Sequence, residues 1–121
     1  MEHLNVIIPY RDRKKHKKRI IKVLYKFLSE SNVPSFRIYI VEQCDDKAFN
    51  KGCLLNIGFL ETNTGPNDYY CFNDVDTLPK SDLAKYHRPP ANTIIHPYGH
   101  WHCLSNLRNI SCHHQRRAKF P

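Results

Sequence analysis

The sequence predicts an α/β fold in which a mostly parallel, doubly wound sheet carries helices on both faces. Between residues 5 and 73, short apolar runs alternate with segments of helical periodicity, in the order strand, helix, strand, helix, strand. The connections are short, and such alternation is typical of parallel strands joined by crossover helices. Ligands of these sheets bind beyond the carboxyl ends of the strands, so we expect a site there.

The first strand and the first helix are predicted from a change of period. Residues 5–9 form an apolar run, and we expect the proline at its end to stop the ladder. Residues 14–29 then follow a helical period, with lysines covering the outer face. The predicted inner face consists of Ile20, Leu24, Phe27 and Leu28, with Val23 at its edge.

The following elements are predicted in the same way. Residues 36–41 are rich in β-branched and aromatic side chains, as expected for a strand. Residues 50–62 are predicted to form a second helix and residues 68–73 a third strand, while residues 93–95 are a candidate for one more strand. We expect one α/β core over residues 1–79. Residues 80–121 are expected to belong to the same domain or to be partly disordered.

Composition is that of a soluble, single-domain protein. Of the 121 residues, 40% are hydrophobic and 25% are charged, and the net charge of +8 favours an anionic partner. The five cysteines include no CxxC pair, and Cys53 and Cys71 are expected to be small core residues. No apolar stretch reaches the ~20 residues of a membrane span, and no signal peptide precedes Leu4. We therefore expect either a cytoplasmic protein or a piece of a longer one.

Two carboxylates follow the third predicted strand directly, as Asp74 and Asp76 with Val75 between them. If the backbone stays extended there, both carboxylates share one face and Val75 faces the core. Hard oxygen ligands suit Mn²⁺ or Mg²⁺, which takes one or two protein carboxylates and shares the phosphates of a substrate. The alternative interpretation is a solvated acidic turn.

Cationic and aromatic side chains occur at two other predicted loop positions. Arg11 and Arg13 follow the first strand, where an arginine fork suits a phosphate or a uracil edge, and Tyr10 offers a ring for stacking on a base. Phe49 and Lys51 open the second helix, where the ring can pack on a base and the helix N-terminus favours an anion. Alternatively, the arginines only begin the basic face of the first helix, and Phe49 packs at the start of the second.

Four segments of the chain, taken together, carry a resemblance to a known family. They are residues 9–13 (PYRDR), 38–43 (IYIVEQ), 49–59 (FNKGCLLNIGF) and 74–79 (DVDTLP). The β-1,4-galactosyltransferase family pairs P-[FY]-R-x-R, I-Y-[VI]-[VI]-x-Q, F-N-[RK]-x-x-L-L-N-[VI]-G-F and D-V-D-x-[LI]-P segments in this order and at similar spacing. The chain resembles that family over residues 5–79.

The resemblance implies a GT-A fold and an inverting transfer of galactose, or a related hexose, from a UDP-sugar to a sugar or glycoconjugate acceptor. In the family the first motif holds the uridine diphosphate. The matching residues here are Pro9, Tyr10, Arg11 and Arg13.

The resemblance also implies roles for the third and fourth motifs. The third motif lines the nucleotide pocket, which implies that role for Phe49 and Lys51. The second aspartate of the fourth motif binds Mn²⁺, which implies Asp76, while Asp74 and Val75 lie against the nucleotide.

The chain departs from the family after this fourth motif. The second half of the family carries a Trp-Gly-rich segment followed by Glu-Asp-Asp, which supplies the acceptor pocket and the catalytic base. Here the only tryptophan is Trp101, and no acidic residue follows Asp82. The catalytic base is therefore unknown, and we interpret the chain as a truncated or fragmentary relative.

The last part of the sequence is rich in metal-ligand residue types. They are His96, His100, His102, Cys103, Cys112, His113 and His114. Such residues can complete a metal site begun by Asp76 or bind zinc, but their spacing matches no zinc pattern well. The alternative is a solvated or partly disordered tail.

Three hypotheses about function stay open at this stage. The first is a glycosyltransferase domain that binds a UDP-sugar through a divalent metal, and the second is a nucleotide-sugar-binding remnant without catalysis. The third is a nucleic-acid-binding module that uses the nine cations between Arg11 and Lys26. We expect the Golgi lumen if the chain is part of an anchored family member, and the cytoplasm otherwise.

Overall fold

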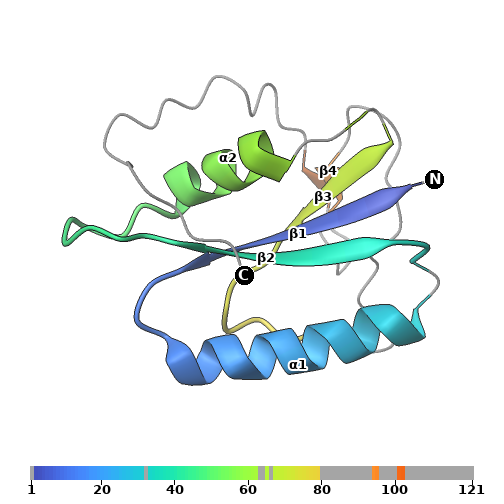
Figure 1. Cartoon of the computed structure of the whole chain (residues 1–121), viewed down its shortest axis with the longest axis horizontal. Helices are drawn as coiled ribbons and strands as arrows, with labels where there is room; N and C mark the ends of the chain where they lie inside the picture. The colour runs from blue at the N-terminus through green and yellow to red at the C-terminus, as the bar shows by residue number, and fades with distance from the viewer. Residues whose placement is uncertain are drawn as a thin grey trace.

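The computed structural model describes residues 2–31, 33–62, 65 and 67–79, together with the backbone of residues 94–95 and 101–102. The strands β1 (His3–Tyr10), β2 (Phe36–Glu42) and β3 (Asp68–Phe72) form a parallel sheet in the order β2-β1-β3. The helices α1 (Lys14–Glu30) and α2 (Lys51–Thr62) cover opposite faces of it (Figure 1). The predicted α/β fold is therefore confirmed.

Two short strands follow the sheet in the chain. The strands β4 (Ile94–Ile95) and β5 (Trp101–His102) pair with each other in antiparallel fashion. The former was expected from the sequence and the latter was not. Within the described residues, no helix is both long enough and apolar enough to cross a membrane.

The strand order places a switch in topology at β1. The chain leaves β1 through α1 to reach β2 on one side, and then returns across β1 through α2 to reach β3 on the other side. The first connection leaves the carboxyl end of β1 and the second that of the neighbouring strand β2, and their helices lie on opposite faces of the sheet. Open α/β sheets form their ligand crevice at the carboxyl ends of strands whose connections diverge in this way. The segments that follow β1 and β3 meet at this edge.

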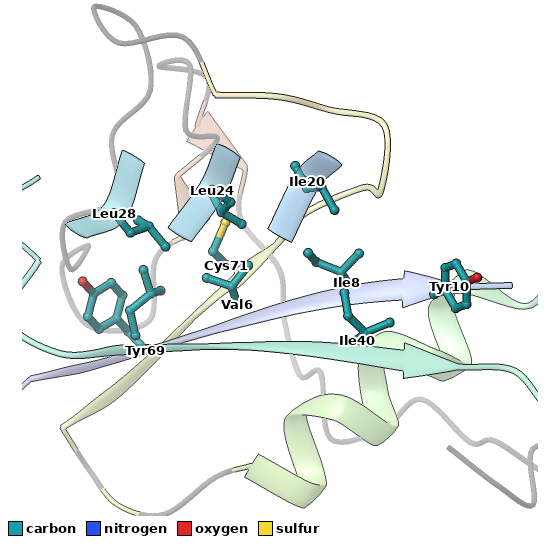
Figure 2. Close-up of a cluster of buried hydrophobic side chains, with 10 residues drawn as sticks. Val6, Ile8, Tyr10, Ile20, Leu24, Leu28, Ile40, Tyr69 and Cys71 are labelled. Atoms are coloured by element: carbon teal, nitrogen blue, oxygen red, sulfur yellow. The ribbon is translucent and has the colours of Figure 1, made fainter. Parts of the chain in front are cut away.

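The larger core lies between α1 and the sheet. The buried residues of α1 are Ile20, Leu24 and Leu28, which form the predicted inner stripe, with Phe27 partly buried beside them. Figure 2 shows the side chains of Ile20, Leu24 and Leu28 facing residues from all three strands of the sheet. Burying each such aliphatic side chain stabilises the fold by roughly 1.5–3 kcal/mol, so this stripe holds α1 against the sheet.

The second core, on the α2 side, depends on a close approach of the backbone. Ile7, Val41 and Leu54 are fully buried there. A Cβ atom added at Gly58 would overlap the side chain of Ile7 and lie 3.2 Å from Cγ2 of Val41. The missing side chain therefore allows α2 to pack directly on the sheet.

The cysteines of the two cores differ in their bonding. Cys53 and Cys71 are both buried, as expected. Cys71 is a free thiol, whereas Cys53 is disulfide-bonded. The prediction that both are small core residues is therefore confirmed, and Cys53 differs from Cys71 in being disulfide-bonded.

The first strand does not end at Pro9, contrary to the prediction. Pro9 pairs with Val41, and β1 continues to Tyr10. The carbonyl of Ile7 accepts a hydrogen bond from Asn73 N at 3.0 Å, so the backbone N–H and C=O groups of Ile7 face β3. Because these groups alternate in direction along a strand, the backbone groups of Pro9, two residues further on, face the same side. Since β3 has ended before this level, the missing N–H of Pro9 removes no ladder hydrogen bond.

Candidate functional site

Arg11 is fixed at the carboxyl end of β1 by the loop that follows β2. Its Nη1 donates to the carbonyl of Asp45 at 3.4 Å and to the carbonyl of Lys47. Its guanidinium carbon lies 5.7 Å from the centre of the Phe49 ring, within the range of a cation–π contact. Both hydrogen bonds come from Nη1, so Nη2 and Nε keep donors that can bind an anion.

The chain reverses direction immediately after Arg11. Asp12 has a φ of 52°, in the left-handed region that aspartate tolerates better than most residues. Arg13 then stands exposed at the N-cap of α1, and its carbonyl accepts the hydrogen bond from Lys17 N at 2.8 Å. The two arginines are thus separated: Arg11 belongs to the loop of Phe49, and Arg13 begins the basic helix.

Gln43 organises this loop, and the sequence interpretation missed its role. Its side chain is 3% exposed. The Nε2 group donates to Asp45 Oδ1 at 2.7 Å and to the carbonyls of Lys47 and Ala48 at 3.3 and 3.1 Å. Its Oε1 accepts from Asn50 N at 2.8 Å. One buried amide therefore shapes the whole turn from Asp45 to Asn50.

The sequence held one signal for Gln43. Gln43 directly follows an apolar strand, and a glutamine at such a position tends to be buried. A buried amide group cannot hydrogen-bond to water, so it needs partners in a neighbouring loop. The bond to Asp45 is also the main reason that the pKa of this carboxyl lies below its usual value. The Asp45 carboxyl therefore loses its proton at a lower pH than an ordinary aspartate.

The start of α2 presents the positive end of a helix to the same edge of the sheet. Asn50, which was predicted to be the first helical residue, instead caps the helix, because its Oδ1 accepts from Cys53 N at 3.0 Å. The first turn contains no acidic residue. Lys51, in that first turn, forms an ion pair with Asp74. This helix end can therefore hold an anion, which both its dipole and the lysine favour.

The segment after β3 is a turn and not an extended strand. Thr77 N donates to the carbonyl of Asp74 at 3.2 Å, which closes a turn over residues 74–77. Asn73 stabilises it, because its Nδ2 donates to the carbonyls of Asp74 and Thr77 at 2.8 and 3.1 Å. The prediction of an extended backbone over the two aspartates is therefore wrong.

The two aspartates of this turn have different environments. Asp74 is held by Lys51, whereas Asp76 is exposed. Val75 packs against the larger core, as predicted. The alternative of an acidic turn correctly describes the backbone, and the turn still presents Asp76 at the carboxyl edge of the sheet.

The side chains at this edge fit a divalent cation that is coordinated partly by the protein and partly by oxygen atoms of a substrate. Among the described residues, no group of three or more His, Cys, Asp and Glu side chains could hold a metal ion. A site made by protein ligands alone, such as a structural zinc site, therefore does not form in this part of the chain. Asp76 offers a single exposed carboxylate, which is sufficient for Mn²⁺ or Mg²⁺ when phosphate oxygens complete the coordination.

Two of the predicted binding residues are buried in the fold. Pro9 and Tyr10 belong to β1, and Tyr10 is 4% exposed within the larger core. Lys17 Nζ lies 4.8 Å from the centre of the tyrosine ring. The prediction that this ring stacks on a base is therefore wrong, and Phe49, which is 45% exposed, is the aromatic ring available at this edge. The histidine-rich tail from His96 onward lies outside the residues whose side chains are described.

The chain is similar in sequence to known galactosyltransferases. The chain is 39% identical over 93 residues to xylosylprotein 4-β-galactosyltransferase of Caenorhabditis elegans, which covers 77% of this chain and 32% of the relative. It is 33% identical over 87 residues to human β-1,4-galactosyltransferase 4, which covers 71% of this chain and 25% of the relative. The chain thus spans about a quarter to a third of the length of these relatives.

A solved structure shares the fold. The crystal structure of a Drosophila β-1,4-galactosyltransferase 7 mutant, in complex with manganese, UDP-Gal and xylobiose, superposes with a TM-score of 0.72 at 28% identity. The superposition covers 80% of this chain and 40% of that one. The GT-A fold expected from the sequence is thereby confirmed. Residues 1–89 match the N-terminal region of glycosyl transferase group 7, and the chain belongs to that family.

Proposed function

We propose that this chain is the nucleotide-sugar-binding part of a glycosyltransferase that uses a UDP-sugar, UDP-galactose in particular, together with a divalent metal. The observation that carries the proposal is the convergence of Arg11, Lys51 and Asp76, from three separate segments of the chain, on the carboxyl edge of the sheet. That edge is where a doubly wound sheet binds its ligand.

The charges at this edge complement a nucleoside diphosphate. Arg11 keeps its Nη2 and Nε donors for a phosphate oxygen, and the N-terminus of α2 with Lys51 favours a second negative charge. The exposed ring of Phe49 lies beside Arg11 and can pack on the base. Asp74 holds Lys51 at the start of the helix and lies within reach of the same ligand.

The metal has a place in this proposal through Asp76. Its exposed carboxylate would hold Mn²⁺ or Mg²⁺ against the diphosphate. When bound there, such an ion would neutralise the negative charge that develops on the departing diphosphate. The manganese and UDP-Gal in the Drosophila structure support this assignment.

The remaining parts of the proposal concern the acceptor and the division of the chain. The Drosophila structure also contains xylobiose, which supports a sugar or glycoconjugate as the acceptor. We assign donor binding to residues 1–79 and leave residues 80–121 as the segment that follows it.

The proposal is tested by calorimetric titration of the chain with UDP, with Mn²⁺ present and after its removal with EDTA. We expect UDP to bind only with the metal. Arg11→Ala should weaken binding by about tenfold or more, because it removes a charge-assisted hydrogen bond. Arg19→Ala, which removes an equal charge from the exposed face of α1, is the matched control. Absence of UDP binding under both conditions would refute the proposal.

A further inference from the structure

The outer side of β2 is a sheet edge in the part of the chain that the structure describes. In the described part of the chain, β2 pairs only with β1. Leu4 N donates to the carbonyl of Ser35, and Gln43 N donates to the carbonyl of Tyr10. The backbone N–H and C=O groups of the odd-numbered residues between 35 and 43 therefore face β1. The backbone N–H and C=O groups of Phe36, Ile38 and Ile40 consequently point away from the sheet, and these form the row to which a further strand can pair.

An apolar groove runs along this edge. It lies between β2 and α1, has a volume of about 310 Å³, and is lined by Ile21, Tyr25, Phe36, Arg37, Ile38 and Ile40. Tyr25 is 61% exposed and meets the Phe36 ring edge to face at 5.5 Å. The residues that expose the backbone row thus also line a space large enough for one side chain of a bound segment.

Lysines flank the groove on its solvent side. Lys18 is three residues before Ile21, and Lys22 is three residues before Tyr25, so each lies beside a groove-lining side chain on the helix surface. Both lysines are exposed, and Lys14 continues their row toward the start of α1. Between Lys14 and Ser29 the helix carries no acidic residue, so nothing on it compensates this charge.

We propose that the outer edge of β2, together with this groove and its lysines, binds an extended acidic polypeptide. The three features specify the occupant. An open strand edge needs a partner that supplies alternating N–H and C=O groups, the groove takes an apolar side chain of that strand, and the lysines pair with acidic side chains.

Other occupants satisfy fewer of these features. Lipid chains supply no hydrogen-bond partners to a strand edge, and polysaccharides and nucleic acids lack the repeat of a β-strand. Pairing with a second copy of the chain would bring two sets of Lys18 and Lys22 together, on molecules that each carry a net charge of +8.

The surface leads toward the candidate donor site. β2 runs from Phe36 to Glu42, and the loop that positions Arg11 and Phe49 follows directly. A polypeptide bound along β2 therefore has one end close to the carboxyl edge of the sheet. If the chain binds a UDP-sugar as proposed above, this surface is suited to a polypeptide that carries the acceptor, a step that rests on the proposed function.

The test uses the full chain and a fluorescent peptide of alternating glutamate and valine with one phenylalanine. Binding is measured by fluorescence anisotropy. A version of the peptide that is N-methylated at every second amide cannot donate along the strand edge. We expect it to bind about tenfold more weakly or worse, because the hydrogen bonds that it would donate to the strand edge are lost. A peptide with lysine in place of glutamate should not bind.

Charge-reversal variants locate the surface. Lys18→Glu with Lys22→Glu should weaken binding of the acidic peptide by about tenfold or more. Arg19→Glu with Lys26→Glu changes the net charge equally but places the new charges away from the groove, so a loss of about threefold or less is expected. UDP binding with Mn²⁺ should be unchanged in both variants, which separates failure of this proposal from failure of the proposed function.

Four outcomes would overturn the proposal. Equal losses in the two double variants would mean that net charge alone drives binding. Undiminished binding of the N-methylated peptide would exclude strand pairing. Binding of heparin or of phosphatidylserine vesicles through Lys18 and Lys22, without peptide binding, would assign the surface to another class of partner. Concentration-dependent dimers that the peptide cannot dissociate would assign it to a second copy.

Discussion

Gln43 and Arg11 donate hydrogen bonds to the same backbone carbonyl, that of Lys47. The buried amide of Gln43 fixes the loop from inside, and the guanidinium of Arg11 is held against the loop from the solvent side. Arg11 therefore depends on Gln43 for its position, although the two side chains are not partners of each other in any hydrogen bond described here. Gln43 is thus a positioning residue for the candidate nucleotide site.

Replacing Gln43 should weaken UDP binding through Arg11. Gln43→Leu leaves the carbonyl of Ala48 and the N–H of Asn50 without this partner, so the loop should lose its shape. We expect UDP affinity with Mn²⁺ to fall by about tenfold. The effect should vanish in an Arg11→Ala background, because residues that act as a unit are not additive.

The control for this prediction removes another buried polar contact far from the site. Thr62→Val deletes the 2.6 Å hydrogen bond from Oγ1 to the carbonyl of Gly58 at the other end of α2. It should lower the free energy of unfolding by about 1 kcal/mol and leave UDP affinity unchanged. If Gln43→Leu lowers stability but not affinity, the glutamine has only a structural role.

Adding a methyl group at Gly58 should destabilise the fold. A Cβ there overlaps Ile7, on a central strand that cannot move, so Gly58→Ala should lower the free energy of unfolding by about 1–3 kcal/mol. Gly52→Ala is the matched control in the same helix, since its nearest atom is Asn50 Oδ1 at 3.9 Å. That change should be neutral or stabilise the protein by up to about 1 kcal/mol. Urea unfolding measures both, and equal effects would contradict the close packing of α2.

Of the two cysteines that are free in the described part of the chain, only one should react in the native protein. Cys44 is exposed, whereas burial raises the pKa of the Cys71 thiol to about 12. At pH 8 the Cys71 thiol is therefore protonated as well as inaccessible, and the thiolate is the form that alkylates. Iodoacetamide followed by peptide mass mapping should label Cys44 at once and Cys71 only after denaturation. Rapid native labelling of Cys71 would show that β3 opens readily.

The sheet and its helices were predictable because their patterns are local. The stripe Ile20, Leu24 and Leu28 repeats every four residues, close to the period of an α-helix, and tertiary packing does not override it. The predicted bounds of α1 differ from the observed ones by one residue, and those of α2 likewise. The convergence of the loops also followed, because parallel strands end at one edge.

The details of the site depend on contacts between distant segments, and these were not predictable. Asn73 turns the backbone of Asp74 through its side-chain amide, and no periodicity records which carbonyls an amide will reach. Tyr10 is buried because α1 and its Lys17 lie over it. Pro9 is tolerated only because the neighbouring strand has already ended. Each outcome is a property of the assembled sheet.

Asp76 should be required for the metal dependence of UDP binding and not for folding. Asp76→Asn keeps the size of an exposed side chain, so the free energy of unfolding should change by less than about 1 kcal/mol. Calorimetry should then detect no enhancement of UDP binding by Mn²⁺. Glu30→Gln, an exposed change at the last residue of α1, is the control and should leave that enhancement intact. Unfolding of the Asp76 variant would make this carboxylate a structural cap of the turn.

The 121-residue chain should bind its donor but transfer sugar poorly. Efficient transfer requires the acceptor hydroxyl to lie within about 3 Å of a base and in line with the departing diphosphate. The described residues place cations and Asp76 on the donor side, and no carboxylate follows Asp82 in the sequence to serve the acceptor. The assay measures UDP release from UDP-galactose, with and without N-acetylglucosamine, xylose or glucose. Release should not respond to any of these acceptors.

Acceptor-stimulated turnover on the order of 1 per second or faster, in the range of ordinary enzymes, would show that a residue after Asp82 acts as the base. His100 and His102 would then be the first to replace, because imidazole titrates near neutrality.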